Sequence, residues 1–363
     1  MSDFAIVGGG IVGLSLAYGL LRLGKRVCLF DEGDIALRAS RGNFGLVWVQ
    51  SKGFSQPEYS HWTRRSAALY KKFSDELQNH SGLDILLEQD GGFTFHMNEA
   101  ELDADRKRFA NHQQTMGGDF PFEVLGHNAL KAEEPNIGPN VAGAIYCPED
   151  GHLNPLRLLQ ALTSVVVSLG GEIKTDSKVA TVTPSHGEFV LSTVAGQHYS
   201  AEKVVLAAGL GALSLGPALG FKTPIRPQQG QILVTEKLPK LIHRPNVEIR
   251  QVNDGGVQIG ASHSEVGFEE GTDIRTIGEL ANNAIKMFPK LQRAQLVRSW
   301  AALRILSPDG LPIYQQSDRY PGAYFVTCHS GITLAAAHTK LLSLWLTEDP
   351  KAPDLSVFSE ERF

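Results

Sequence analysis

The fold is decided near the N-terminus by the stretch Phe4-Ala-Ile-Val-Gly-Gly-Gly-Ile-Val-Gly13. Its first four residues are apolar and predict a buried strand, and Gly8, Gly10 and Gly13 have the G-x-G-x-x-G spacing of a dinucleotide-binding turn. In such a turn the first glycine permits the tight bend, the second lets a pyrophosphate approach the backbone, and the third lets helix and strand pack closely. This stretch therefore predicts a strand, a phosphate-binding turn and the start of a helix.

A helix and a second strand complete a βαβ unit. The helix predicted from residue 11 begins with Ile11 and Val12, whose amides and helix dipole would face the phosphates. Asp31 ends the next apolar strand, where a carboxylate can accept hydrogen bonds from a ribose. If the strand ends one residue later, Glu32 would accept the hydrogen bonds from the ribose in place of Asp31. A glycine turn that serves packing alone would not need this terminal acid.

The composition excludes several classes of protein. The 363 residues carry 34 Lys+Arg against 39 Asp+Glu, a formal net charge of −5, without the clustered cations of a nucleic-acid binder. Cys28, Cys147 and Cys328 lie far apart, which argues against disulfides or a metal site and favours small buried side chains in a reducing cytoplasm. Residues Ala5 to Leu21 carry no charge, but the run is rich in glycine and the chain opens Met-Ser-Asp without positive charge, so a signal peptide or membrane span is not expected.

Strand–helix units of the parallel type recur along the chain. Residues 203–208 and 323–327 predict buried strands that each end in a glycine-containing turn, as the first strand does. The intervening segments are typical of antiparallel strands. We therefore expect an α/β fold (α+β overall) with two domains. The expected dinucleotide-binding domain is discontinuous, residues 1–85, 142–222 and 306–363, and the expected substrate domain comprises residues 86–141 and 223–305.

Further motifs follow the glycine turn in a fixed order. They are Ser40-x-x-Asn43-x-Gly45, Asp150–Pro155, Leu206–Gly209, Pro227–Gln231, Val257–Gly260, Leu303-Arg304 with Ser307–Gly310, and His329–Gly331. In this order they resemble the D-amino acid oxidase superfamily of FAD-dependent oxidoreductases over nearly the whole chain. Within it the chain is most similar to D-hydroxyproline dehydrogenase β subunits, opine oxidase B subunits and hydrogen cyanide synthase C subunits. Glycine oxidase and sarcosine oxidase are more distant.

The resemblance implies a Rossmann-like FAD domain of the glutathione-reductase type with an inserted antiparallel-sheet substrate domain. The FAD is expected to be non-covalent, because Ala302 and Leu303 stand where sarcosine-oxidase-like members attach flavin through a cysteine. Besides the residues above, the resemblance assigns these to the cofactor: Ser40, Arg41, Asn43 and Gly45 along the pyrophosphate, Val179 at the adenine, Ala208 and Gly209 in a close turn, and His329, Gly331, Ile332 and Thr333 at the flavin. A surface arginine is the alternative for Arg41, strand core for Val179, and an ordinary helix cap for the residues after Ser330.

The start of the last helix is expected to assist flavin reduction. Amides of Gly331, Ile332 and Thr333 would face the pyrimidine edge, where negative charge accumulates when hydride arrives. Thr333 is expected to add a side-chain donor.

Arg304 is the residue expected to bind substrate. It matches the arginine that pairs with the substrate carboxylate in amino-acid-oxidising members, and a guanidinium can hold a carboxylate with two hydrogen bonds and orient the α-C–H toward flavin N5. A salt bridge to a protein acid is the alternative. Arg250 is a secondary candidate, with a surface arginine as the alternative. Trp48 and Gln50 are expected along the flavin's active face, with a core tryptophan as the alternative.

The expected activity is FAD-dependent oxidation of a D-amino or imino acid by hydride transfer from its α-carbon, with D-hydroxyproline as the best-matching substrate. The alternatives are an opine- or glycine-type amine oxidase or dehydrogenase, a flavin subunit active only with partner subunits, and an NAD-dependent dehydrogenase, which leaves the later motifs unexplained. The electron acceptor stays open between O₂, a quinone and a partner subunit. A cytoplasmic location is expected, and peripheral attachment to the inner membrane and a hetero-oligomer stay open.

Overall fold

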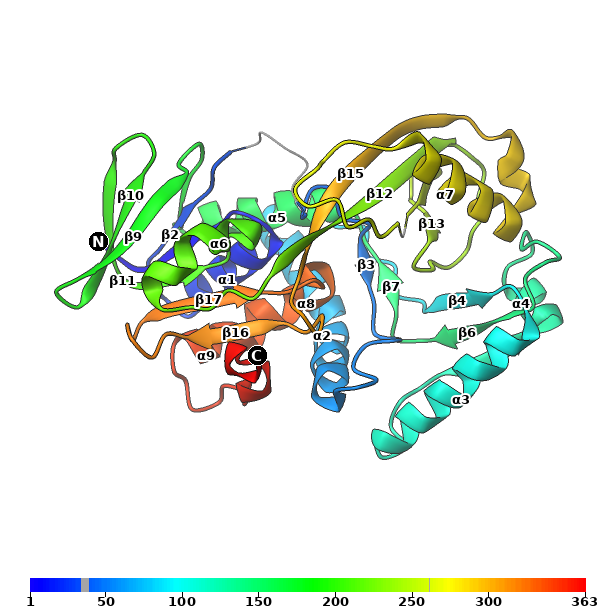
Figure 1. The fold of residues 1–363 in the computed structure, drawn as a ribbon, viewed down its shortest axis with the longest axis horizontal. Coiled ribbons are helices and arrows are strands. Elements are labelled where there is room, and N and C mark those ends of the chain that lie inside the picture. The colour runs from blue at the N-terminus through cyan, green and yellow to red at the C-terminus, as the bar shows by residue number, and fades with distance from the viewer. Residues whose placement is uncertain (34–38, 261) are drawn as a thin grey trace.

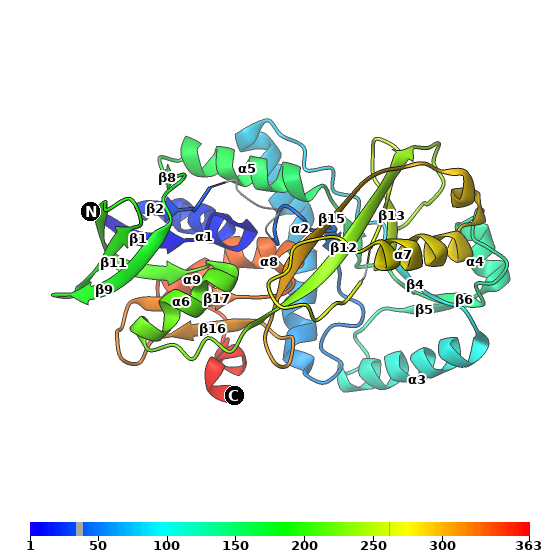
Figure 2. The ribbon, with the colours of Figure 1, turned by 45° about the horizontal axis from the view of Figure 1, so that its top comes forward.

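The computed structural model describes residues 1–33, 39–260 and 262–363. Its elements form an elongated molecule with a large sheet and its helices at one end and smaller antiparallel sheets at the other (Figures 1 and 2). Both termini lie in the part that holds the large sheet (Figure 1). Within the described ranges, no helix is both long enough and apolar enough to cross a membrane.

The large sheet is built around the strand of the glycine turn. Its main path runs β16-β17-β11-β1-β2-β8, and β10 and β9 extend β11 on a branch. The strands are β1 (Ser2–Val7), β2 (Val27–Phe30), β8 (Glu172–Lys174), β9 (Val179–Ser185), β10 (Glu188–Thr193), β11 (His198–Leu206), β16 (Ile313–Gln316) and β17 (Ala323–Thr327). Strands β8, β2, β1, β11 and β17 run parallel, so their carboxyl ends meet at one edge, where ligands of such sheets bind.

Helices cover this sheet through apolar side chains. One layer contains α1 (Ile11–Arg22), α2 (Pro57–Ser81), α5 (Pro155–Ser168), α8 (Gly331–Ala337), a π-helical turn (His338–Leu342) and α9 (Ser343–Leu346). Fully buried residues such as Leu16, Tyr70, Leu162 and Ala335 join these helices in one core. The short α6 (Ala212–Leu215) contributes to a second core with β1, β11 and β17. Short 3₁₀ helices span Gly209–Gly211, Gly216–Leu219, Pro289–Arg293, Ser356–Phe358 and Glu360–Arg362.

Antiparallel sheets form the other end of the molecule. The four-stranded sheet has the order β13-β14-β12-β15, and the three-stranded sheet the order β4-β6-β5. Their elements are β4 (Gly92–His96), α3 (Glu99–Thr115), β5 (Glu123–Gly126), α4 (His127–Glu133), β6 (Gly143–Cys147), β12 (Arg226–Lys237), β13 (Ile249–Gln251), β14 (Gly256–Ile259), α7 (Ile274–Met287) and β15 (Leu296–Leu306). Phe93, Leu233 and Phe288 share a third core between the two sheets. A short pair, β3 (Leu46–Val47) with β7 (Gly151–His152), lies between the two ends.

One expected domain boundary disagrees with this pairing. The boundary before residue 142 would separate β6 from β4 and β5, yet β6 is hydrogen-bonded to both. The reason is that strand pairing depends on partners distant in the chain, which an apolar run does not identify by itself. The placement of residues 143–147 in the nucleotide-binding part was therefore wrong, and the remaining boundaries stay predictions.

The π-helical turn predicts an acid sensitivity of the fold. His338 is fully buried there, its Nε2 accepts from the hydroxyl of Tyr314 at 2.9 Å, and burial lowers the pKa of its imidazole to about 3. A histidine in the unfolded chain has a pKa near 6.5. Between that pH and about 3, the imidazole is therefore protonated in the unfolded state but neutral in the folded state. Stability therefore falls as the pH decreases from about 6.5 toward 3.

At pH 5, His338 is expected to lower the free energy of unfolding by about 2 kcal/mol relative to pH 7.5. Urea unfolding at pH 7.5 and 5.0 measures it, with His338→Gln as the comparison because glutamine can still accept from Tyr314. The variant should lose about 2 kcal/mol less than the wild type. An equal loss in both proteins would contradict a neutral buried His338.

Candidate active site

A cavity of about 880 Å³ lies between the carboxyl edge of the large sheet and the four-stranded sheet. Its wall includes the glycine turn, the ends of β2, β11 and β17, the first turn of α8, and residues of β12 and β15. All but four of the residues expected at cofactor or substrate line this cavity. Those brought together are Gly8, Gly10, Ile11, Val12, Asp31, Glu32, Ser40, Arg41, Asn43, Trp48, Val179, Ala208, Gly209, Arg304, His329, Gly331, Ile332 and Thr333. Gly13, Gly45, Gln50 and Arg250 lie outside its lining.

The glycine turn is shaped by two close backbone approaches. Gly8 has φ +111°, and a Cβ there would collide with the carbonyl oxygen of Ala207 at the end of β11. A Cβ at Gly13 would collide with the carbonyl oxygen of Gly8. Gly13 thus serves the packing of helix against turn, which explains why it does not border the cavity.

Asp31, at the end of the neighbouring strand β2, is hydrogen-bonded to the glycine turn. Its Oδ2 accepts from the amide of Gly9 at 2.7 Å, and its Oδ1 accepts from the amide of Gly33 at 3.0 Å. Glu32 forms an ion pair with Lys178 at 3.2 Å. Both acids border the cavity, so the ribose position expected for Asp31 or Glu32 is available to either.

The loop after β2 holds the start of α1. The hydroxyl of Ser40 accepts from the amide of Ile11 at 3.0 Å, and Oδ1 of Asn43 accepts from the amide of Gly45 at 2.8 Å. Gly45 has φ +90°, and a Cβ there would lie 2.7 Å from Nη2 of Arg250. The same Cβ would collide with the carbonyl oxygen of Leu153, so Gly45 is required by the close approach of Leu153 and Arg250 and not by the cavity.

Arg250 lies beneath this loop, with only 1% of its surface exposed. Its guanidinium donates to Nδ1 of His152, to the carbonyl of Leu153 and to Oε1 of Gln258, each at 2.9 Å, and it stands 5.5 Å from the centre of the Phe44 ring. Burial lowers the pKa of Arg250 to about 9. The surface interpretation of Arg250 was therefore wrong, and its position is that of a support for the loop rather than of a substrate ligand.

Removing this support should destabilise the protein. In Arg250→Met the acceptors on His152, Leu153 and Gln258 lose their donor, and at about 1 kcal/mol for each lost hydrogen bond the unfolding free energy should fall by about 3 kcal/mol. Urea unfolding measures this loss. Arg298→Met, on an exposed part of β15, is the control and should stay within about 0.5 kcal/mol of the wild type. A loss of that small size for Arg250→Met would contradict the supporting role.

The first turn of α8 borders the cavity, with Gly331, Ile332 and Thr333 in its lining. The hydroxyl of Thr333 accepts from the amide of Trp48 at 3.1 Å and donates to the carbonyl of Leu46 at 3.3 Å. In this structure the hydroxyl of Thr333 donates within the protein, and its expected contact with the flavin stays a prediction. The hydroxyl holds the segment that contains Trp48 against α8.

Gln50 was expected in the lining and is not there. It is fully buried, and its amide nitrogen donates to Asp150 at 2.6 Å and to the carbonyl of Gly92 at 3.2 Å. Asp150 also accepts from the amides of Val49 and Gln50, and its burial raises the pKa of this carboxyl to about 7. Asp150 therefore anchors the loop beside the cavity. Asp150 belongs to the motif Asp150–Pro155, but the sequence alone did not predict this anchoring role.

The end of the cavity near α8 is rich in cations. Nη1 of Arg304 donates to the carbonyls of Ser262 and Gln229 at 2.7 and 3.3 Å, and no carboxylate of the described residues forms an ion pair with it. Desolvation by the cavity walls, followed by the charges of Lys52 and Arg304, lowers the pKa of His329 to about 3. His329 is therefore a neutral imidazole at physiological pH, and Lys52 is a cavity residue that sequence motifs did not reveal.

These features fit a bound FAD. The lining of the cavity includes both the glycine turn and the first turn of α8, so one elongated ligand could contact both. The indole N–H of Trp48 is buried without an acceptor among the described residues, as expected where a polar ligand completes the wall. Ala302 and Leu303 border the cavity, and the expectation of non-covalent attachment stays a prediction.

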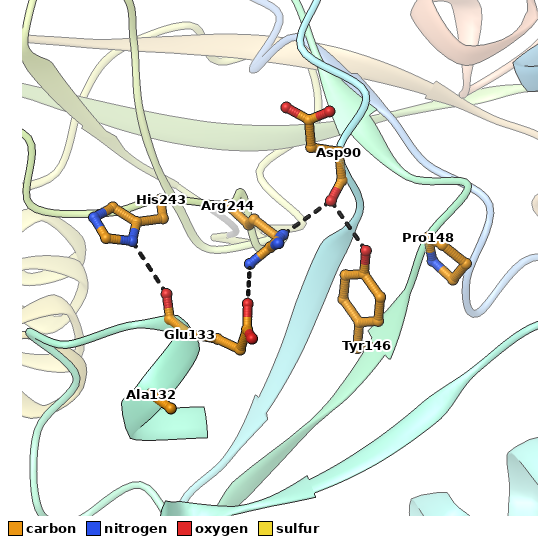
Figure 3. Close-up of a pocket in the computed structure, with 7 residues that line it drawn as sticks. All are labelled: Asp90, Ala132, Glu133, Tyr146, Pro148, His243 and Arg244. Carbon is orange, nitrogen blue, oxygen red and sulfur yellow. Dashed lines mark hydrogen bonds and ion pairs between the residues drawn. The ribbon is translucent and has the colours of Figure 1, made fainter. Parts of the chain in front are cut away.

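A second hollow lies on the antiparallel part of the molecule (Figure 3). There Arg244 donates to Glu133 at 2.8 Å and to the carbonyl of Asp90 at 2.9 Å, and the hydroxyl of Tyr146 donates to the same carbonyl at 3.1 Å. These polar groups satisfy one another, and none of the expected site residues lines the hollow. We therefore assign it no ligand.

The cysteines and other potential metal ligands form no site in the described structure. Cys28, Cys147 and Cys328 are all buried and unpaired, which confirms their expected burial. Among the residues with described positions, no three His, Cys, Asp or Glu side chains gather as a metal site would require.

Comparison with known proteins agrees with this geometry. Residues 3–345 match the DAO family, described as FAD dependent oxidoreductase. The opine oxidase B subunit of Agrobacterium tumefaciens (strain Ach5) is 40% identical over 366 residues, covering 99% of this chain and 97% of that protein. The HcnC protein of Pseudomonas protegens, a hydrogen cyanide synthase subunit, is 28% identical over 408 residues, with 99% and 96% covered. The crystal structure of glycine oxidase from Geobacillus kaustophilus has a TM-score of 0.93 at 26% identity, with 100% of this chain and 99% of that chain covered.

These matches confirm the α/β fold and FAD as the cofactor, and an NAD-dependent dehydrogenase does not account for them. The match extends through β17 and α8 into α9, so it includes both the glycine turn and the cationic end of the cavity. From its sequence, its fold and the lining of its cavity, this chain belongs to the DAO family of FAD-dependent oxidoreductases.

Proposed function

We propose that this enzyme oxidises the C–N bond of an amino acid whose carboxylate is bound by Arg304. The observation that carries the proposal is the position of Arg304: its guanidinium borders the cavity, two backbone carbonyls hold it in place, and no carboxylate of the described protein residues neutralises it. A carboxylate is the anion whose shape matches a guanidinium, and bidentate pairing would fix the substrate in one orientation.

Each part of the wall has a role in this reaction. Bound FAD supplies the hydride acceptor. Arg304 orients the α-carbon of a neutral amine, the apolar walls formed by Ile232, Leu303 and Ile305 exclude water, and the amides at the start of α8 favour negative charge nearby. His329 is neutral, so it adds no charge that would repel the cationic product. The residues that would hold the cofactor are those of the glycine turn, the loop from Ser40 to Asn43, Val179 and Ala208.

The substrate proposed first is an opine, an amino acid with a secondary amine, supported by the 40% identity to a protein named as the B subunit of an opine oxidase. D-Hydroxyproline, the substrate expected from the sequence, also presents a carboxylate beside a secondary amine and is the second candidate. Because two of the relatives are named as subunits, we also propose that this chain works within a hetero-oligomer. The discontinuous division into a cofactor and a substrate domain, and a cytoplasmic location, belong to the same proposal.

An anaerobic titration tests this function. The purified protein with FAD bound is mixed with an opine, with D-hydroxyproline and with glycine, and the flavin absorbance near 450 nm is followed. Bleaching by an opine, by D-hydroxyproline or by both supports the proposal and ranks the two substrates. Re-oxidation of the bleached protein by O₂ or by a quinone then identifies the acceptor. A flavin that none of these amino acids reduces, alone or after co-expression with the partner subunits, would refute it.

A further inference from the structure

Lys52 occupies an unusual position for a lysine. It borders the cavity, and its Nζ donates to the hydroxyl oxygen of Ser330 at 3.0 Å, directly before α8. The hydroxyl of Tyr59 donates to the same oxygen at 2.9 Å. The ammonium of Lys52 is thus held at the α8 end of the cavity by a neutral acceptor.

No protein carboxylate balances this charge by direct contact. Within the described ranges, Lys52 forms no ion pair, and the carboxylate that acts on it electrostatically is that of Asp150. The carboxylate of Asp150 is already engaged by the amides of Val49 and Gln50 and by the side chain of Gln50. Burial lowers the pKa of Lys52, which is the sign of a cation that lacks sufficient compensation.

Arg304 lies at the same end of the cavity. The charges of both Lys52 and Arg304 act on His329, and all three side chains border the cavity. Of the acids in its lining, Asp31 and Glu32 follow β2 at the glycine turn, and Glu270 lies in an exposed segment. Two cations at one end of a cavity, without paired carboxylates among the described residues, favour a ligand with two negative charges.

We propose that Lys52 is a specificity-determining residue that binds a second acidic group of the substrate. An opine, the substrate proposed first, is a secondary amine flanked by two carboxylates; Arg304 would bind one of them and Lys52 the other. An ammonium has three donors, of which Ser330 takes one, so two remain for a carboxylate. This inference rests on the proposed function of the same cavity and names its substrate class.

The test uses two small amines that differ only in the second acidic group. Iminodiacetate carries two carboxylates around a secondary amine, and N-methylglycine replaces one of them with hydrogen. For each, kcat/KM and the dissociation constant from perturbation of the flavin spectrum are measured in the wild type, Lys52→Met and Lys52→Arg. Lys71→Met, which removes an exposed charge on α2, is the control.

The wild type should favour iminodiacetate, and Lys52→Met should weaken its binding and lower its kcat/KM by about 100-fold while N-methylglycine changes by less than about threefold. Lys52→Arg should restore part of the preference, and Lys71→Met should not alter it. If Lys52→Met affects both amines equally, or neither, Lys52 is not the second anchor. The binding measurement separates this result from failure of the proposed function, because it needs no turnover: iminodiacetate that binds through Lys52 without being oxidised would support the role of Lys52, and the anaerobic titration with an opine and D-hydroxyproline would still decide the proposed function.

Discussion

Replacing Arg304 with glutamine is expected to lower kcat/KM for the amino-acid substrate by at least about 100-fold, because a desolvated charge pair contributes roughly 2–5 kcal/mol. The loss should appear both as weaker binding and as slower flavin reduction, since the guanidinium both attracts the carboxylate and orients the α-carbon. Rapid-mixing measurements of flavin reduction at several substrate concentrations separate the two effects.

The control is Arg304→Lys, which keeps the charge but not the planar pair of donors. Arg304→Lys should recover part of the affinity for the substrate carboxylate but little of the orientation of the α-carbon. Its KM should therefore be closer to the wild-type value than its kcat. The FAD content of both variants should stay that of the wild type, because Arg304 is anchored to the carbonyl of Gln229 on β12 and to that of Ser262, away from the glycine turn. Substrate oxidation that survives Arg304→Gln unchanged would show that another group binds the carboxylate.

Replacing Gly8 with alanine is expected to yield protein without FAD. The added Cβ would meet the backbone carbonyl of Ala207, which no side-chain movement can relieve, and alanine is also strained at φ +111°. The turn would have to shift where the pyrophosphate approaches it, and an affinity loss of at least about 100-fold follows from as little as 2.7 kcal/mol of lost binding free energy.

Gly24→Ala is the matched control, because Gly24 also has a positive φ of +75° but has open space around its Cβ position. It should bind FAD normally and lose only about 1 kcal/mol of stability from backbone strain. The absorbance ratio at 450 and 280 nm, and titration of each apoprotein with FAD, measure the difference. Wild-type affinity in Gly8→Ala would mean that the cofactor does not lie against this turn.

The sequence predicted those parts of the site whose structure is determined by residues close together in the chain. The apolar run, the glycine spacing and Asp31 together predicted β1, the turn and the end of β2, and the apolar run at residues 323–327 predicted β17. These elements are encoded within a few residues of one another, where backbone conformation and hydrophobic patterning decide the outcome.

Contacts between distant segments could not be predicted in this way. The burial of Arg250 depends on acceptors that β7 and β14 bring to it, and the hydroxyl of Thr333 is taken by the loop at Leu46. Lys52 belongs to no motif, and only the fold places it next to Ser330. Such roles are set by tertiary packing, on which a single polar residue in a sequence carries no information.

The buried bonds of Arg250 and Asp150 have a mechanical consequence. Arg250 joins the four-stranded sheet to the segment at Leu153, and Asp150 joins the loop at Val49 to the turn before β7. A rotation of the four-stranded sheet against the segment at Leu153 would have to break the solvent-shielded bonds of Arg250. Because Arg304 stands on the same sheet, we expect its position in the cavity wall to be set in the resting fold, so that the alignment proposed for the substrate carboxylate would be preorganised rather than acquired through rigid-body closure when substrate arrives.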